Sequence, residues 1–339
     1  FIGSFSTLTL NSEISSSQYV HTNCSIVFLL SDFKNSLDKF NSNTLPSTYS
    51  LAFASVPALS SAPMVTLPEE LTTAPTVPLL CFNPAEYPDL PVLTDEASFR
   101  LNCGVLKDMI KRTVFSVSTG ERNPVHTGVK FEISENKIVL VAVDGARLAI
   151  RREEVSYFSE EKPELSFVVP AKTLNEIIKL SGDDEKEIEI KAGDRHIIFK
   201  IDGYEIISRL LEGNFLNYKS AIPLTWGTKI IVDTKRLIEC IERTSLIITD
   251  KSSPVRCTVE NGIMRFSSVT AIGTASDKME AEIEGKTIEI GFNNRFVLDC
   301  LKACDAETIK IEMSSSNQPI TFSPLEGDDF FFLVLPVRI

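Results

Sequence analysis

Ser98-Phe99-Arg100-Leu101 leads directly into a helix-like stretch at residues 103–114. The same arrangement returns later in the chain, where Lys229-Ile230-Ile231-Val232 leads into a second helix-like stretch at residues 233–247. Self-similarity at a regular spacing is typical of a repeated structural unit. The two stretches therefore predict that a strand followed by a helix occurs twice.

A second pair of segments extends the repeat. Phe167-Val168-Val169-Pro170 enters a helix-like stretch at residues 170–180, and Glu289-Ile290-Gly291-Phe292 enters one at residues 293–304. One unit should therefore consist of a strand, a helix, several strands, a second helix and several further strands.

We expect this unit at residues 97–224 and again at residues 225–339. Its helices are amphipathic, since apolar residues such as Leu106 and Met109 recur at helical spacing. Alternating runs such as residues 188–191 predict strands between and after the helices. Two helices packed on antiparallel sheet, in repeated units, make an α+β architecture.

The overall composition sets limits on the class of protein. The chain has 339 residues, enough for two or three domains, and 43% of them are hydrophobic, which allows a substantial core. Its formal net charge is −12, from 34 basic and 46 acidic residues. Proteins that bind nucleic acids are usually basic. An overall charge does not say where the charges lie, however, so an acidic protein can still carry one basic surface.

Residues 1–80 differ in composition from the rest of the chain. They carry few charged residues and many Ser and Thr, and stretches such as residues 47–78 lack helical or strand periodicity. This composition is typical of a loop-rich or poorly ordered segment. A segment that does not faithfully represent the natural protein would show the same features, and the sequence leaves both interpretations open.

The cysteines indicate the redox environment. They lie at positions 24, 81, 103, 240, 257, 300 and 304, without a pair at Cys-x-x-Cys spacing. This pattern favours reduced, mostly buried thiols and a cytoplasmic location. Cys300 and Cys304 share one face of an expected helix, but two soft ligands alone make a poor metal site. No apolar run reaches the length of a membrane span, and we expect no signal peptide.

Motifs of catalysis do not stand out in the sequence. There is no P-loop, no Gly-x-Gly-x-x-Gly after a strand, no His-Glu-x-x-His and no Gly-x-Ser-x-Gly. Three histidines, at positions 21, 126 and 196, follow no ligand pattern, and the acidic cluster at residues 183–185 lies in a turn-like segment. We therefore expect no catalytic residue, no metal and no cofactor.

Three segments carry a resemblance to a known family. They are residues 139–150, residues 212–223 and Leu333-Val334-Leu335-Pro336-Val337-Arg338-Ile339. In this order and spacing they resemble the bacterial sliding clamp, the β subunit of DNA polymerase III. The resemblance covers roughly residues 82–339. It implies the DNA clamp fold and three domains, at residues 1–96, 97–224 and 225–339, although residues 1–80 do not show the pattern of the first.

The resemblance also implies a function. Clamp subunits join head to tail as a homodimeric ring, helices line the hole, and the ring is a non-catalytic processivity factor on duplex DNA. Implied partners are the catalytic subunit of DNA polymerase III, the clamp loader and other clamp-binding replication and repair proteins, which we call clients. A nucleic-acid-processing enzyme and a degenerate monomeric peptide-binding module are the alternative interpretations.

Basic residues on the expected helices are candidates for the surface that faces DNA. Ordinary solvated helix faces would show the same charges, so the residues alone leave this alternative open. A mildly positive surface would follow phosphates without reading bases. The candidates are Lys107, Lys111, Arg112, Lys172, Lys179, Lys235, Arg236, Arg243, Arg295 and Lys302.

The resemblance further implies an apolar pocket that receives a short client peptide. Its residues would be His126, Val143, Gly145, Ala146, Arg147, Leu148, Leu216, Ser220, Ala221, Leu333, Leu335, Pro336, Val337 and Arg338. By burial tendency alone, several of the apolar members could equally be core.

Five of these positions depart from the usual family pattern. His126 stands where an aliphatic residue is common, Val143 and Ala146 replace more polar residues, Leu216 replaces a common proline, and Ser220 replaces a common basic residue. The pocket stays apolar and rich in small residues, so we expect it to persist with altered preferences.

Overall fold

The computed structural model describes residues 5–9, 50–54, 97–120, 123–134, 137–154, 164–249 and 253–339. The chain divides into two compact units, Phe1–Leu90 and Pro91–Ile339. In the first unit, β1 (Phe5–Thr9) pairs with β2 (Ser50–Ala54) as an antiparallel ribbon. Most of the expected first domain, residues 1–96, lies outside the described residues.

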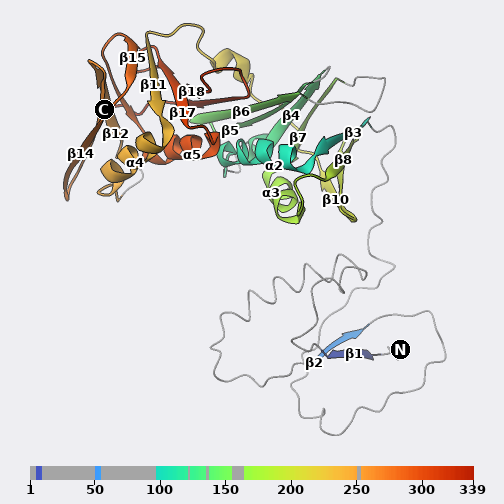
Figure 1. Ribbon diagram of the computed structural model, residues 1–339. Coiled ribbons are helices and arrows are strands. Elements are labelled where there is room, and N and C mark those ends of the chain that lie inside the picture. The colour runs from blue at the N-terminus through green and yellow to red at the C-terminus, as the bar shows by residue number, and fades with distance from the viewer. Residues whose placement is uncertain are drawn as a thin grey trace, which may run out of the picture. The chain divides into compact units, whose positions relative to one another are not determined.

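The second unit contains the predicted repeat (Figure 1). The elements of its first copy are β3 (Ala97–Asn102), α2 (Cys103–Lys111), η4 (Val114–Ser116), η5 (Pro124–Thr127), β4 (Gly128–Ser134), β5 (Lys137–Val143), β6 (Arg147–Glu154), β7 (Leu165–Pro170), α3 (Ala171–Leu180), β8 (Glu187–Ala192), β9 (His196–Ile201), β10 (Tyr204–Arg209) and η6 (Tyr218–Ala221).

The second copy follows the same order, with one additional short strand, β15. Its elements are β11 (Thr228–Asp233), α4 (Thr234–Ser245), β12 (Val255–Glu260), β13 (Ile263–Thr270), β14 (Gly273–Glu280), β15 (Glu282–Gly285), β16 (Ile288–Phe292), α5 (Asn294–Cys304), β17 (Thr308–Met313), β18 (Ile320–Ser323) and β19 (Phe330–Val334). The predicted α+β plan of two helices on antiparallel sheet, repeated, is confirmed.

A nine-stranded antiparallel sheet joins the two copies. Its order is β15-β11-β17-β18-β19-β6-β5-β4-β7, so the last strand of the second copy pairs with β6 of the first. Two four-stranded sheets, β10-β9-β8-β3 and β14-β13-β12-β16, complete the unit. The order β6-β5-β4-β7 in the first copy corresponds to β14-β13-β12-β16 in the second, and β10-β9-β8-β3 corresponds to β19-β18-β17-β11.

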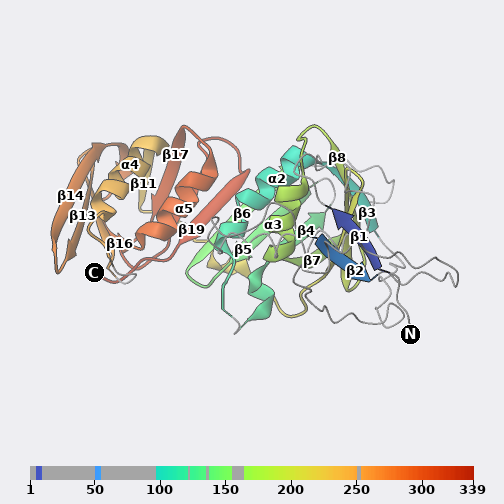
Figure 2. The same ribbon diagram turned by 90° about the horizontal axis from the view of Figure 1, so that it is seen from below.

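The helices lie on one face of these sheets (Figures 1 and 2). Three of them begin at a side chain that accepts hydrogen bonds from the first turn. Asn102 caps α2, Asp233 caps α4 and Asn293 caps α5. Such caps satisfy backbone N–H groups that have no partner within the helix. The helix starts are therefore fixed locally, while the apolar stripe of each helix decides which side packs on the sheet.

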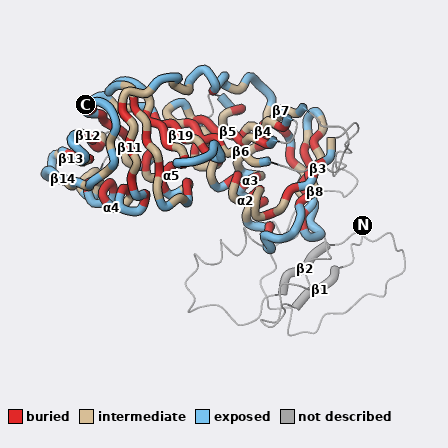
Figure 3. The backbone as a smooth tube through the Cα atoms, turned by 45° about the horizontal axis from the view of Figure 1, so that its top comes forward, coloured by how far each residue is buried: buried red, intermediate tan, exposed pale blue. Residues whose placement is uncertain are grey.

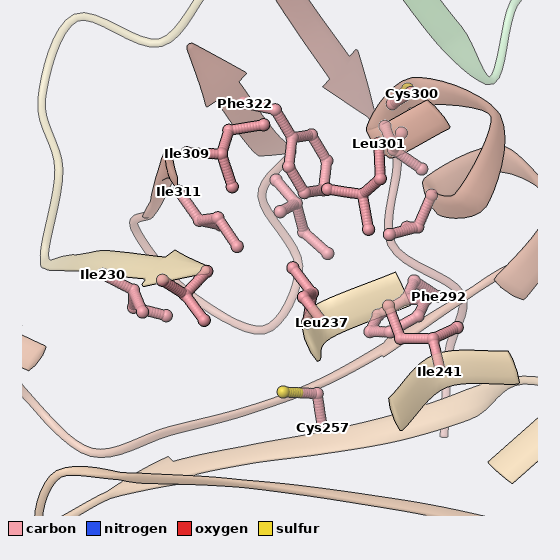
Figure 4. Close-up of a cluster of buried hydrophobic side chains, with 14 of the residues drawn as sticks. Ile230, Leu237, Ile241, Cys257, Phe292, Cys300, Leu301, Ile309, Ile311 and Phe322 are labelled. Carbon is pink, nitrogen blue, oxygen red and sulfur yellow. The ribbon is translucent and has the colours of Figure 1, made fainter. Parts of the chain in front are cut away.

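Each copy of the repeat has its own hydrophobic core, and buried residues run along β4, β5, β11 and β19 (Figure 3). In the second copy, Leu237, Leu301 and Phe322 extend from α4, α5 and β18 into a shared interior (Figure 4). The first copy is built in the same way around residues such as Phe131 and Leu106.

The cysteines of the described residues belong to these cores. Cys103, Cys240, Cys257, Cys300 and Cys304 are all free and buried, as the sequence predicts. Burial raises the pKa of the Cys240 thiol to about 12. Thiols in apolar surroundings are poor nucleophiles, so these cysteines serve packing.

The described residues contain neither a candidate membrane span nor a candidate metal site. No helix in that part of the chain is long and apolar enough to cross a membrane. The same residues contain no group of three or more His, Cys, Asp or Glu side chains that could hold a metal ion.

Phe322→Ala tests the packing of the second core. Phe322 is 2% exposed, and truncating a buried phenylalanine leaves a cavity that costs about 3–5 kcal/mol. We expect the free energy of unfolding, from urea denaturation followed by circular dichroism, to fall by that amount. Leu325→Ala, at a leucine that is 46% exposed, should change it by less than about 0.5 kcal/mol. Equal effects of the two variants would contradict the assigned core.

Candidate functional site

The junction between the two copies of the repeat brings together half of the predicted pocket residues. Strands β6 and β19 pair in antiparallel register, with Leu148 opposite Leu333 and Arg147 opposite Val334. Directly after β19, the N–H of Leu335 donates to the carbonyl oxygen of Ala146 over 2.8 Å. Two segments far apart in the sequence, the turn before β6 and the residues after β19, thus lie side by side.

The turn between β5 and β6 is held by Asp144. Its Oδ1 accepts the N–H groups of Ala146 (2.9 Å) and Arg147 (3.0 Å). Gly145 has a φ of 91°, in the left-handed region that favours glycine. An aspartate that bonds the backbone two and three residues ahead, followed by glycine, is a local signal for a tight turn.

A small apolar cluster fills the space beneath this junction. Val143 from β5, Leu148 from β6 and Leu333 from β19 are each less than 5% exposed, and they pack together. Leu216 and Leu335, by contrast, are 45% and 41% exposed. The first three are therefore the buried floor of the junction. Leu335 is exposed directly after β19, and Leu216 is exposed in the segment that leads into η6.

The remaining predicted residues lie at different distances from this floor. His126, in η5, packs edge-on against the ring of Phe215 at a centroid distance of 5.3 Å. Ser220 and Ala221 are exposed in η6. Val337 pairs with Gly291 at the end of β16, in the second copy of the repeat.

Sequence reasoning missed a group of side chains beside the floor. Tyr218 is buried in the apolar cluster, and its hydroxyl donates to Oε2 of Glu132 over 2.7 Å. The Nζ of Lys130 donates to the other carboxylate oxygen of Glu132 over 2.7 Å and lies over the ring of Phe215. Lys219 adds a longer ion pair with Glu132, at 3.8 Å. The group ties η6 to β4.

Burial and hydrogen bonds shift the pKa of two members of this group, Glu132 and Tyr218. Burial alone would raise the pKa of the Glu132 carboxyl, but hydrogen bonds from Lys130 and Tyr218 outweigh it and hold that pKa below its usual value. Burial, together with the hydrogen bond to Glu132, raises the pKa of the Tyr218 hydroxyl well above its usual range. Glu132 is thus a carboxylate at neutral pH, and Tyr218 is its neutral donor.

The predicted basic residues of the helices fall into two groups. Some are occupied by other contacts: Lys107 by Asp184 and Ser181, Arg112 by Asp108 and the carbonyl of Cys304, and Lys179, Arg243 and Lys302 by acidic neighbours. The others are exposed and make no ion pair within the described part of the chain. These are Lys111, Lys172, Lys235, Arg236 and Arg295.

Glu132→Gln tests the electrostatic role of the group through its pH dependence. A carboxyl whose pKa is lowered by folding binds fewer protons in the folded state. Its stabilising contribution is therefore complete above the pKa of the unfolded chain, near 4.5, and is lost as the pH falls through the lowered folded value. We expect the difference in Tm between the wild type and this variant to be largest near neutral pH and to shrink as the pH falls below 4.5.

Thermal unfolding followed by circular dichroism, from about pH 7 to about pH 3, measures this difference. Tyr218→Phe provides a matched comparison because it removes one donor to Glu132 and keeps the aromatic ring. A Tm difference between wild type and Glu132→Gln that stays constant over this range would contradict the assigned role of the carboxylate.

Comparisons with known proteins agree on one family. Residues 100–217 match the family described as DNA polymerase III beta subunit, central domain, and residues 219–338 match its C-terminal domain. The beta sliding clamp of Halalkalibacterium halodurans is 35% identical over 260 residues, which are 76% of this chain and 68% of the relative. The beta sliding clamp of Staphylococcus aureus is 32% identical over 259 residues, with the same coverage.

Solved structures give the same result. The DNA polymerase sliding clamp from Bacillus subtilis superimposes with a TM-score of 0.73 at 29% identity, over 76% of this chain and 68% of the other. A putative DNA polymerase III beta subunit from Eubacterium rectale superimposes with a TM-score of 0.72 at 30% identity, over 75% and 69% of the two chains.

Proposed function

This chain belongs to the family of the DNA polymerase III beta subunit, the bacterial sliding clamp, and we propose that it encircles duplex DNA as a homodimeric ring that tethers client proteins. The family is non-catalytic. We assign three ring-forming domains, at residues 1–96, 97–224 and 225–339. The single observation that carries the ring proposal is the pairing of β6 with β19, since it joins one repeat to the next through a continuous sheet.

We expect the contact between copies of the chain to use the same kind of strand pairing as the β6–β19 junction. Among the described strands, β14 is an edge strand of the second repeat, and it has the place that β6 has in the first repeat. In a head-to-tail dimer, β14 of one copy would pair with the first domain of its partner. Contacts between unlike surfaces close into a ring when the rotation from unit to unit permits it.

Exposed apolar side chains at the same end of the second repeat support this interface. Arg112-Thr113 corresponds to Arg243-Thr244, so Phe115 corresponds to Leu246. Phe115 packs against Phe332 across the junction at a centroid distance of 5.5 Å. Leu246 is 81% exposed, and Val269 and Ile272 near the β13–β14 turn are each 71% exposed. Where exposed apolar side chains form one contiguous patch, they mark an interaction surface.

The helices carry exposed basic side chains that can attract the phosphates of DNA. Lys111, Lys172, Lys235, Arg236 and Arg295 are exposed and unpaired among the described residues, and they are distributed over all four helices. Such cations attract phosphates irrespective of base sequence. A closed ring is retained by topology, so these contacts can stay weak enough to permit sliding, while the net charge of −12 keeps the rest of the surface acidic.

The pocket at the β6–β19 junction is the proposed client site. Leu216 and Leu335 offer exposed apolar side chains, and Pro336, which follows the end of β19, has no backbone N–H to donate. The proposed clients are the catalytic subunit of DNA polymerase III, the clamp loader and other replication and repair proteins, acting in the cytoplasm. Tethering a client to a ring on DNA raises its effective concentration at the primer end.

Retention on DNA of different topology tests this function. The full chain is loaded by a clamp loader with ATP onto nicked circular DNA, and the complex is then passed through a gel-filtration column. We expect the protein to stay with the circle and to be released when a restriction enzyme linearises it, because a ring slides off free ends. Equal loss from circular and linear DNA would contradict encirclement.

Two leucine variants test the proposed interface between copies of the chain. Leu246→Glu places a charge in the proposed interface between copies and should reduce retention on the circle at least tenfold. Leu224→Glu adds the same charge at a leucine that is 94% exposed and should be retained like the wild type. Equal retention of the two variants would remove Leu246 from the interface.

A further inference from the structure

One arginine connects the turn of the pocket to a helix of the other repeat. The side chain of Arg147 is only 11% exposed. Its Nε donates to Oδ2 of Asp144 over 2.8 Å, and its Nη1 donates to Oδ2 of Asp299, on α5, over 2.6 Å. Arg147 therefore joins the turn between β5 and β6, in the first repeat, to a helix in the second.

Two aromatic rings enclose this guanidinium. Its central carbon lies 4.5 Å from the centroid of Phe296 and 5.6 Å from that of Phe115. Phe296 and Asp299 are one helical turn apart on α5, so they approach Arg147 from the same side. The rings exclude water and attract the cation, and a charged hydrogen bond is stronger where water is excluded. The position of the guanidinium is therefore well defined.

The pairing of β6 with β19 does not depend on the ion pair between Arg147 and Asp299. Backbone pairing between β6 and β19 extends from Arg151 opposite Phe330 to Arg147 opposite Val334. Beyond Arg147 the strand pairing ends, and the turn is held by Asp144, whose Oδ1 accepts the N–H groups of Ala146 and Arg147. A Cβ at Gly145 would meet nothing within 4 Å, and Leu335 donates to the carbonyl of Ala146 from the opposite wall. A change at Asp299 should therefore act on the turn before it acts on the fold.

We propose that Asp299 is a positioning residue for the client pocket. Through Arg147 it anchors the β5–β6 turn to α5, and so it fixes the position of the turn beside Leu335. Asp299 contacts no client in this assignment. The proposal rests on the proposed function of the pocket as a peptide site.

The expected size of the effect follows from the exposure of the pair. The side chain of Asp299 is 45% exposed, so its ion pair adds little to the stability of the fold. Its effect on a pocket that must match a ligand is geometric. We expect loss of the carboxylate to weaken peptide binding about fivefold, within the range for mutations that act on a site indirectly.

Asp299→Asn in the full chain provides the direct test. The probe is a fluorescein-labelled decapeptide with two leucines and one phenylalanine at its centre, and its Kd is measured by fluorescence anisotropy. We expect Asp299→Asn to raise the Kd about fivefold, Asp299→Glu to recover part of the loss, and the Tm of both variants to stay within about 2 °C of the wild type.

Glu242→Gln is the matched control. The carboxylate of Glu242 also contacts α5, through Lys302 at 2.7 Å, and it is 47% exposed. It lies away from the turn, so this variant should bind the probe like the wild type. A Kd for Asp299→Asn equal to that of Glu242→Gln would overturn the positioning role, and so would a large fall in Tm that accompanies weaker binding.

Hydrogen exchange without peptide separates this proposal from the function of the pocket. Amides of residues 145–148 and of Leu335 should exchange faster in Asp299→Asn than in the wild type, while those of β4 stay unchanged. Unchanged exchange at the turn would overturn the proposal even where peptide binds. If the wild type fails to bind the probe although Asp299→Asn loosens the turn, the client site is wrong and the positioning contact stands.

Discussion

A strand at the edge of a sheet presents a row of N–H and C=O groups that must find partners in water or in another strand. The pairing of β6 with β19 solves this problem inside the chain, and the rest of the structure depends on it. It makes one nine-stranded sheet from two repeats, and it brings the turn at Gly145 beside Leu335. It also places Phe115 against Phe332. The continuous sheet, the turn beside Leu335 and the contact between Phe115 and Phe332 thus all result from the pairing of β6 with β19.

The pairing of edge strands also explains how repeats of this kind can assemble into a ring. A repeat that presents one kind of edge at one end and the complementary kind at the other can add further repeats without a new type of contact. Helices on one face of the sheet then form one continuous surface (Figure 2). Exposed cations such as Lys172, Arg236 and Arg295 are distributed over these helices. The proposed ring needs only weak contacts with DNA, because a closed ring holds its DNA by topology while the cations only screen the phosphates.

Much of the fold could be predicted from the sequence because its signals are local and repeated. The apolar periodicity around Leu106 and Met109, and the recurrence of Arg112-Thr113 as Arg243-Thr244, depend only on neighbouring residues. Buried cysteines followed from composition. The short strand β15 was not predicted, since its pairing with β11 is a tertiary contact that leaves little local pattern.

The site was harder to read for the same reason. Segments near the Gly145 turn and Leu333 could be marked by family resemblance, but no spacing in the sequence shows that Tyr218 donates to Glu132 or that Arg147 reaches Asp299. These contacts join residues far apart in the chain. Helix charge counts also could not separate Arg112, which is occupied at the junction, from an exposed cation.

In the proposed ring, sheet pairing continues from one copy of the chain to the next through β14. Hydrogen exchange of the β14 amides, measured by mass spectrometry at concentrations above and below assembly, tests it most directly. We expect the amides of β14 that do not bond to β13 to exchange slowly in the assembled protein and rapidly after dilution, while those of β12 stay constant. Equal exchange of β14 at both concentrations, while sedimentation shows that assembly has changed, would contradict it.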